Sequence, residues 1–168
     1  TPYAYLAAWN AMDAARLLAN WTKQGVVCRY AESAFRLEGR DWPAGTLVAT
    51  RADNRKNPKF DRVVQTTATR LGFLVATAQT GFVDAGRDLG SDGFRLVKAP
   101  KVLVLSGEKT WNNEYGQVWF YFDKDIEYPA TFMDADRLGR ADLADYNVIV
   151  MPEGNYDFSE STLEKLGS

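Results

Sequence analysis

The chain has 168 residues, of which 46% are hydrophobic, so it is long and apolar enough to form one domain or two small ones with a buried core. Its 20 Lys and Arg residues against 22 Asp and Glu give a formal net charge of -2, and the basic residues are scattered. Nucleic acid or an anionic membrane would call for a clustered basic field. No stretch of the sequence is long and apolar enough to span a bilayer. We therefore expect no nucleic-acid partner and no membrane span.

The absence of histidine excludes several kinds of catalytic site. The sequence has no histidine and one cysteine, Cys28. It therefore cannot form a structural zinc site, a His-based catalytic zinc site, a Ser-His-Asp triad or a Cys-His pair. Cys28 lies in the apolar segment Val26 to Tyr30, which predicts a buried thiol that acts as a small apolar group. We expect no catalytic residue, no metal ligand and no cofactor in this chain.

The first half of the sequence alternates strand and helix patterns. Strands are predicted at residues 3–8, 26–30, 46–50 and 73–78, and helices at 10–25 and 57–72. A loop marked by Gly and Pro separates the second and third strands, and Gly25 and Gly72 are placed to end the two helices. The glycine-rich segment Thr80 to Lys98 is the expected connection between the halves, although its apolar residues predict that it packs rather than flexes.

The second half repeats the pattern. Strands are predicted at 101–105, 130–133 and 147–151, with a helix at 115–124 and a capping-box helix start at Ser161 to Glu164. Both halves thus predict an α/β fold with flanking helices and a mostly parallel sheet or sheets. The expected domains are 1–98 and 99–168, with one continuous domain as the alternative. The non-signal-like start and the late helix predict that the chain is part of a longer protein and that the second domain is truncated.

Two loops are the candidate ligand-binding sites. Ser106, Gly107 and Glu108 follow one aliphatic strand, and Glu153, Gly154 and Asn155 follow another. In an open parallel sheet, ligands bind at the carboxyl ends of the strands. A glycine there allows close backbone approach to a ligand, or simply a sharp turn. Neither loop has the spacing of a Walker A or dinucleotide-binding motif.

Two other groups of residues allow alternative functions. Four carboxylates, Asp134, Asp136, Asp142 and Asp145, could serve a hydrolase that uses carboxylates alone, or could lie in solvated loops. Aromatic residues gather between Trp111 and Tyr128. They predict a core with its rim, an interface with another domain, or a surface on which a carbohydrate or peptide stacks.

Several stretches resemble one protein family. They are Lys101 to Gly107, Gly116 to Phe122, Tyr128 to Thr131 and Asp145 to Gly154 in the second half, and Pro2 to Tyr5, Phe35, Gly45 to Val48 and Asp88 to Ser91 in the first. They resemble the region that follows the catalytic domain in large bacterial M14-family zinc carboxypeptidase-like proteins. The second half of that region is similar to a class I glutamine amidotransferase-like, flavodoxin-like domain.

The resemblance implies a parent protein that is a zinc metallocarboxypeptidase, secreted or periplasmic, whose zinc and catalytic residues lie in another domain. This chain is then a non-catalytic accessory module that supports or orients the peptidase domain, and its partners are other domains of the same parent chain. The resemblance gives no support to glutaminase chemistry, because Cys28 lies in the wrong half to be the nucleophile. The alternative function is a module that binds a small ligand, a peptide or a glycan through the strand-end loops.

Overall fold

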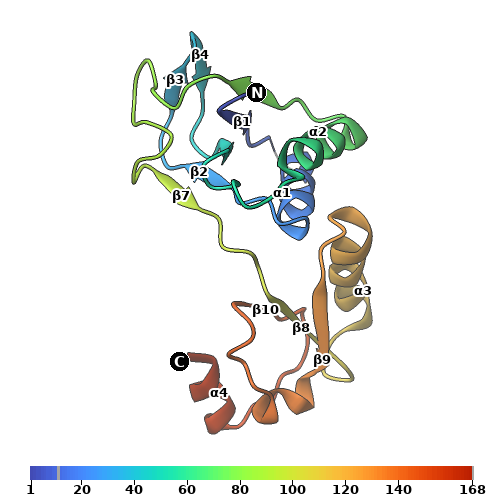
Figure 1. Ribbon diagram of the computed structural model, residues 1–168. Helices are drawn as coiled ribbons and strands as arrows, with labels where there is room; N and C mark the ends of the chain where they lie inside the picture. The colour runs from blue at the N-terminus through green and yellow to red at the C-terminus, as the bar shows by residue number, and fades with distance from the viewer. Residues whose placement is uncertain (11, 168) are drawn as a thin grey trace. The chain divides into compact units, whose positions relative to one another are not determined.

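The computed structural model describes residues 1–10 and 12–167, and the chain folds into two compact units, Thr1–Lys98 and Ala99–Ser168 (Figure 1). Each unit has its own sheet and its own buried core. No helix within the described ranges is both long and apolar enough to cross a membrane.

The first unit is built on a five-stranded sheet. Its strands are β1 (Ala4–Ala7), β2 (Arg29–Ala31), β5 (Leu47–Thr50), β6 (Ala76–Ala78) and β7 (Phe94–Leu96), in the order β6-β1-β5-β2-β7. Every pairing in this sheet is antiparallel. Tyr5 on β1 stands opposite Ala49 on one side and Thr77 on the other. All four residues of β1 are buried, because both faces of the sheet are covered.

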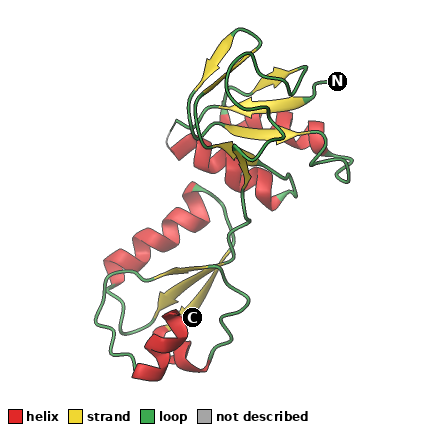
Figure 2. Ribbon diagram, turned by 90° about the vertical axis from the view of Figure 1, so that its left-hand side faces the viewer, coloured by secondary structure: helices red, strands yellow, loops and turns green. Residues whose placement is uncertain are grey.

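Two helices, α1 (Met12–Lys23) and α2 (Phe60–Leu71), cover one face of this sheet (Figure 2). Their apolar residues recur at helical spacing and pack against the side chains that alternate to this face of the strands. Trp21 on α1 and Val64 on α2 are fully buried. Tyr5 meets Phe60 edge to face, with 5.4 Å between the ring centroids. This cluster is the main core of the unit.

The opposite face of the sheet packs against a hairpin of β3 (Phe35–Leu37) and β4 (Arg40–Trp42). Its two turn residues, Glu38 and Gly39, have φ of 51° and 76°, and positive φ at both positions matches the twist of a tight hairpin. Phe35 stacks on Trp42 at 6.3 Å. The sequence predicted only a loop here, because strands of three residues carry too little alternation to be recognised.

The prediction of a mostly parallel, flavodoxin-like or amidotransferase-like fold is wrong, since the main sheet is antiparallel throughout. Helix α1 connects β1 to β2, and both strands run antiparallel to β5, which lies between them. Likewise α2 connects β5 to β6, which flank β1. Each helix therefore joins two strands of the same direction that are not neighbours. The strand-helix-strand pattern predicts relative direction, but it does not reveal a third strand inserted between the two.

The segment predicted to connect the halves, Thr80 to Lys98, lies in the first unit and contains β7. Leu89 and Phe94 are buried in the core beneath the hairpin. Phe82 is 78% exposed and Leu96 is 51% exposed, so only part of the segment's apolar residues pack.

Two ion pairs join the segment that follows β5 to other parts of the first unit. Arg29 on β2 donates two hydrogen bonds to Asp53, at 2.7 and 3.0 Å, and Thr50 donates a third at 2.8 Å. Arg51 makes a two-point contact with Asp61 on α2, at 2.6 and 3.1 Å. These contacts lower the pKa of both carboxyl groups, chiefly through the hydrogen bond from Arg29 in Asp53 and from Arg51 in Asp61.

Cys28 is buried in the helix-side core of the same unit, as predicted. Burial disfavours the thiolate and raises the pKa of the thiol to about 12. The thiol is therefore protonated and unreactive in the folded unit.

The second unit contains a three-stranded parallel sheet of β8 (Val102–Ser106), β9 (Ala130–Asp134) and β10 (Val148–Val150), in the order β10-β8-β9. The α-helix α3 (Asn112–Phe120) continues into a π-helical turn, η1 (Tyr121–Asp125). A 3-10 helix, η2 (Ala135–Arg140), follows β9, and α4 (Glu160–Gly167) comes after β10. The aliphatic strand β8 is central, and Leu103 and Leu105 are fully buried.

Candidate functional site

The carboxyl ends of the three parallel strands meet at one edge of the second unit. The chain passes from β8 to β9 on one side and returns to β10 on the other side of β8. The connection from β9 to β10 therefore crosses β8, so the strand order reverses here, and in open parallel sheets ligands bind near such a reversal. Ser106 is the last residue of β8 and is followed by Gly107 and Glu108, and the loop after β10 contains Glu153, Gly154 and Asn155. The six candidate residues therefore lie at the same edge of the sheet.

Backbone hydrogen bonds join these two loops directly. Asn155 N–H donates to the Lys109 carbonyl at 2.9 Å, and Trp111 N–H donates to the Glu153 carbonyl at 2.9 Å. Thr110 and Gly154 form an antiparallel bridge between these contacts. The structure thus brings both predicted loops together, but it does so by pairing them with each other.

The two glycines have a structural explanation in this arrangement. A Cβ on Gly154 would lie 2.1 Å from the Lys109 carbonyl oxygen, which no side chain tolerates. Gly107 has φ of +96°, and a Cβ there would lie 2.7 Å from an Asp134 carboxylate oxygen. Both glycines allow protein groups to approach one another.

Most charged side chains at this edge are acidic, and one of them pairs with an ammonium group. Lys109 Nζ lies 2.9 Å from an Asp136 carboxylate oxygen, and this contact is the main reason that the pKa of Lys109 is raised. Asp134 accepts a hydrogen bond from Asp136 N–H at 2.9 Å. Glu108 and Glu153 are exposed to solvent. The edge therefore favours a ligand that is cationic or that donates hydrogen bonds.

The sequence did not assign Lys109, Asp134 and Asp136 to this site. Asp134 is the last residue of β9 and Asp136 lies two residues further on, so their place at the end of a parallel strand was the available signal. No sequence pattern identified Lys109 as a site residue, because only the pairing of the two loops brings it opposite η2. In residues 1–10 and 12–167 no group of three or more His, Cys, Asp or Glu side chains is arranged to hold a metal ion.

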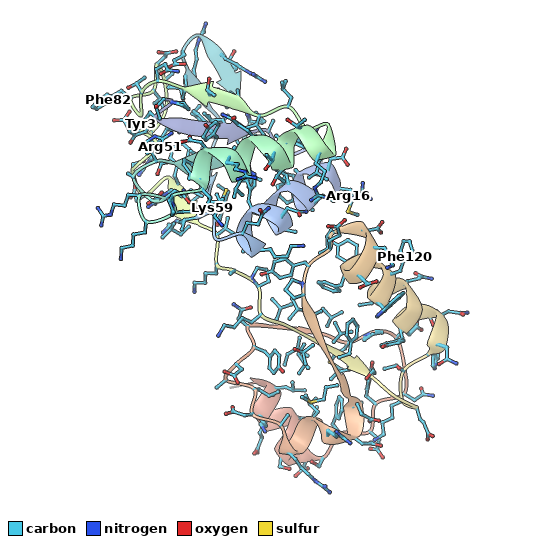
Figure 3. The ribbon with its side chains drawn as sticks, turned by 45° about the vertical axis from the view of Figure 1, so that its right-hand side comes forward. Tyr3, Arg16, Arg51, Lys59, Phe82 and Phe120 are labelled. Atoms are coloured by element: carbon cyan, nitrogen blue, oxygen red, sulfur yellow. The ribbon has the colours of Figure 1, made fainter. Side chains whose placement is uncertain are left out.

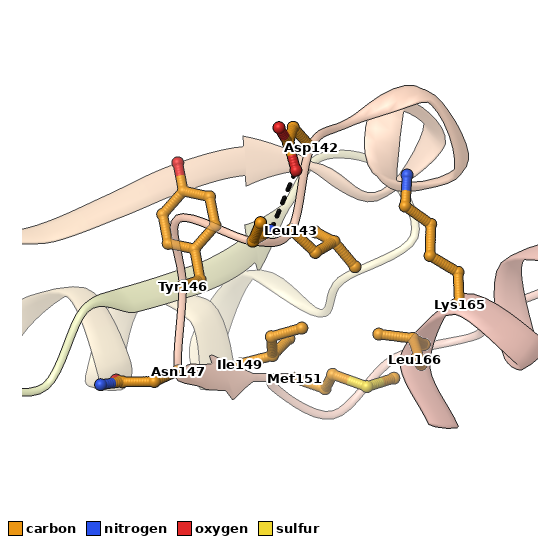
Figure 4. A pocket seen from close by; sticks show the side chains of 9 residues that line it. Asp142, Leu143, Tyr146, Asn147, Ile149, Met151, Lys165 and Leu166 are labelled. Atoms are coloured by element: carbon orange, nitrogen blue, oxygen red, sulfur yellow. Dashed lines mark hydrogen bonds between the residues drawn. The ribbon is translucent and has the colours of Figure 1, made fainter. Parts of the chain in front are cut away.

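A separate pocket of about 820 Å³ lies beside β10 (Figure 4). Its apolar lining includes Leu143, Ile149, Met151 and Leu166, with Lys165 at the side. Lys165 Nζ donates to the Ala141 carbonyl. Sequence patterns did not predict this pocket, because an aliphatic strand at a sheet edge has the same pattern as one in the middle.

The comparisons with known proteins add no relative to this description. No protein-family model matches the sequence, and neither a curated protein nor a solved structure is significantly similar to the chain. The resemblance to the M14-family region therefore rests on the sequence stretches alone.

Proposed function

We propose that this chain is a non-catalytic accessory module of a secreted M14-like zinc metallocarboxypeptidase, in which it supports or orients the peptidase domain. The chain has no histidine with which to build such a zinc site itself, so the parent's zinc and catalytic residues belong to another domain. Its partners are then other domains of the parent.

The observation that carries this proposal is the exposed aromatic surface at α3. Trp111 is 47% exposed and Trp119 is 41% exposed. Phe120, which Figure 3 labels, is 52% exposed. None of the nine residues of α3 is buried. Large aromatic side chains left in water favour association with another protein surface. A module that packs on a peptidase domain needs such a surface, whereas an independent enzyme does not.

The proposal is tested in the full-length protein that carries this chain. We expect Trp119→Ser with Phe120→Ser to lower the release of C-terminal residues from a peptide substrate at least tenfold. The control is Leu163→Ser, which removes a 54% exposed apolar residue from α4. Zinc-dependent release of a C-terminal residue by residues 1–168 alone would contradict the proposal, as would full activity of the double variant.

A second candidate is a ligand-binding module, and the meeting of the two strand-end loops favours it. Its expected result is a rise in Tm on adding a basic tripeptide or a trisaccharide, which Glu108→Gln removes and Glu160→Gln, a control on α4, leaves intact. Gly154 is unsuitable for this test, because any side chain there breaks the loop pairing itself. Equal shifts in both variants would contradict binding at the loops.

A further inference from the structure

A groove in the first unit runs between helix α2 and the edge strand β6. It has a volume of about 450 Å³. Its floor is formed by Tyr5, Val64 and Ala68, which are buried, and Phe73 and Val75 line it from the strand side. Clefts of this size with an apolar floor and polar groups on the walls are typical of ligand sites.

The turn after α2 creates the groove. Gly72 adopts the left-handed conformation at φ +62° and ends the helix, with its N–H donating to the Thr69 carbonyl at 3.2 Å. Phe73 N–H donates to the Ala68 carbonyl at 2.9 Å. The chain then returns toward β6, so that the strand and the helix become the two walls.

The strand wall is an open sheet edge. β6 is the last strand in the order of its sheet, and among the described strands it pairs with β1 alone. An edge strand presents backbone N–H and C=O groups that lack a partner strand. Residues 73–78 carry no charge and no proline, and Leu74 is 75% exposed. The segment therefore has neither the charge nor the proline that discourages the addition of another strand.

The other edge of the same sheet differs in this respect. Arg95 lies in the middle of β7 and pairs with Glu32 at 2.8 Å, and Lys98 follows the strand. Charged side chains on an edge strand discourage strand addition. The sheet therefore has one protected edge and one edge that is free to accept a partner.

We propose that the β6 edge and the α2 groove bind an extended, uncharged peptide segment of another polypeptide. The peptide pairs with β6 as a sixth strand through backbone hydrogen bonds, and alternate aliphatic side chains enter the groove over Ala68. The backbone groups at the edge specify an extended chain. The apolar floor and the uncharged segment specify aliphatic side chains. The polar residues Gln65 and Thr69 line the helix side of the groove.

The test uses an acetylated and amidated hexapeptide of alternating threonine and valine. Two matched peptides carry N-methyl groups, one on every valine amide and the other on every threonine amide. Only one set of amides faces β6 in a strand, so one methylated peptide should bind at least tenfold more weakly than the parent peptide, and the other should bind like it. Binding is followed by backbone amide NMR shifts, which we expect at residues 64–69 and 73–78.

Two variants of α2 complete the test. Thr69→Trp fills the groove and is expected to abolish binding, whereas Thr66→Trp adds the same side chain at an exposed position outside the groove lining. Circular dichroism checks that both variants fold. Equal affinity for all three peptides would overturn the proposal, since it would show that no strand forms. A concentration-dependent dimer with the same shifted amides would also overturn it, since the occupant would then be a second copy of the chain.

Discussion

The two units place helices between strands in the same chain order, yet they form opposite kinds of sheet. In the first unit α1 and α2 link strands of the same direction that have an antiparallel strand between them. In the second unit α3 links β8 to β9, which are parallel neighbours. The difference shows that a helix between two strands fixes their relative direction, while the sheet type depends on whether a third strand is inserted.

The units also differ in how fully they bury their sheets. The first unit has cores on both faces of its sheet, with Trp21, Tyr5 and Leu6 fully buried. In the second unit β8 is buried from Val102 to Leu105, whereas Val148 on β10 is 39% exposed. Since stability follows buried apolar surface, we expect the first unit to be the more stable.

The largest effect is expected from removing the central side chain of the first core. Trp21→Ala leaves a cavity between α1 and the sheet and should lower the free energy of unfolding of the first unit by about 3–5 kcal/mol. Urea unfolding, read by hydrogen exchange in each unit separately, measures this change. Protection in residues 99–167 should stay unchanged. An equal loss in both units would show that they unfold as one, and the comparison would then fail.

A smaller effect is expected from separating the strand-end loops of the second unit. Gly154→Ala forces the backbone away from Lys109 and should lower the free energy of unfolding of that unit by about 1–3 kcal/mol. The control is Gly116→Ala on α3, where nothing lies within 4 Å of the new Cβ. That change should raise the stability by at most about 1 kcal/mol, because alanine favours helix. Equal effects of the two variants would remove the structural role given to Gly154.

The smallest effect concerns stability in acid. As the pH falls, the first unit should lose more stability than the second. The lowered pKa of Asp53 means that its contribution is present above about pH 4, the ordinary range of a carboxyl group, and is lost as the pH falls through the lowered value. Asp53→Asn should cost about 1 kcal/mol at pH 7 and should make the acid-side loss shallower. Unfolding curves between pH 7 and pH 2 check this, and an unchanged slope would contradict it.

Sequence patterns predicted the elements that are long and periodic. The aliphatic run at β8 and the apolar stripes of α1 and α2 predicted the strand and helices found there. The hairpin at Phe35 to Trp42 was missed, because its strands are three residues each and its only strong signal is Gly39. The start of α2 was also predicted too early. Asn57 was expected to begin this helix, which starts at Phe60. The Asn57 side chain instead accepts a hydrogen bond from Lys59 N–H at 3.0 Å.

The candidate site was only partly predictable, because it depends on contacts between distant segments. Glycine after an aliphatic strand correctly indicated the two loops at the strand ends. That Gly154 touches Lys109 and that Gly107 touches Asp134 follows from the strand order, which local patterns do not contain. The groove beside β6 gave no signal either, since it arises from the return of the chain after Gly72.

The buried thiol of the first unit is a natural chemical probe of how that unit opens. A thiol reagent reacts with the thiolate, which Cys28 forms only when water reaches it. Because the chain holds no other cysteine, each modified molecule records one opening of the helix-side core. When the reagent is concentrated enough for labelling to outpace reclosing, the rate of labelling therefore gives the rate at which the first unit opens, without any engineered probe.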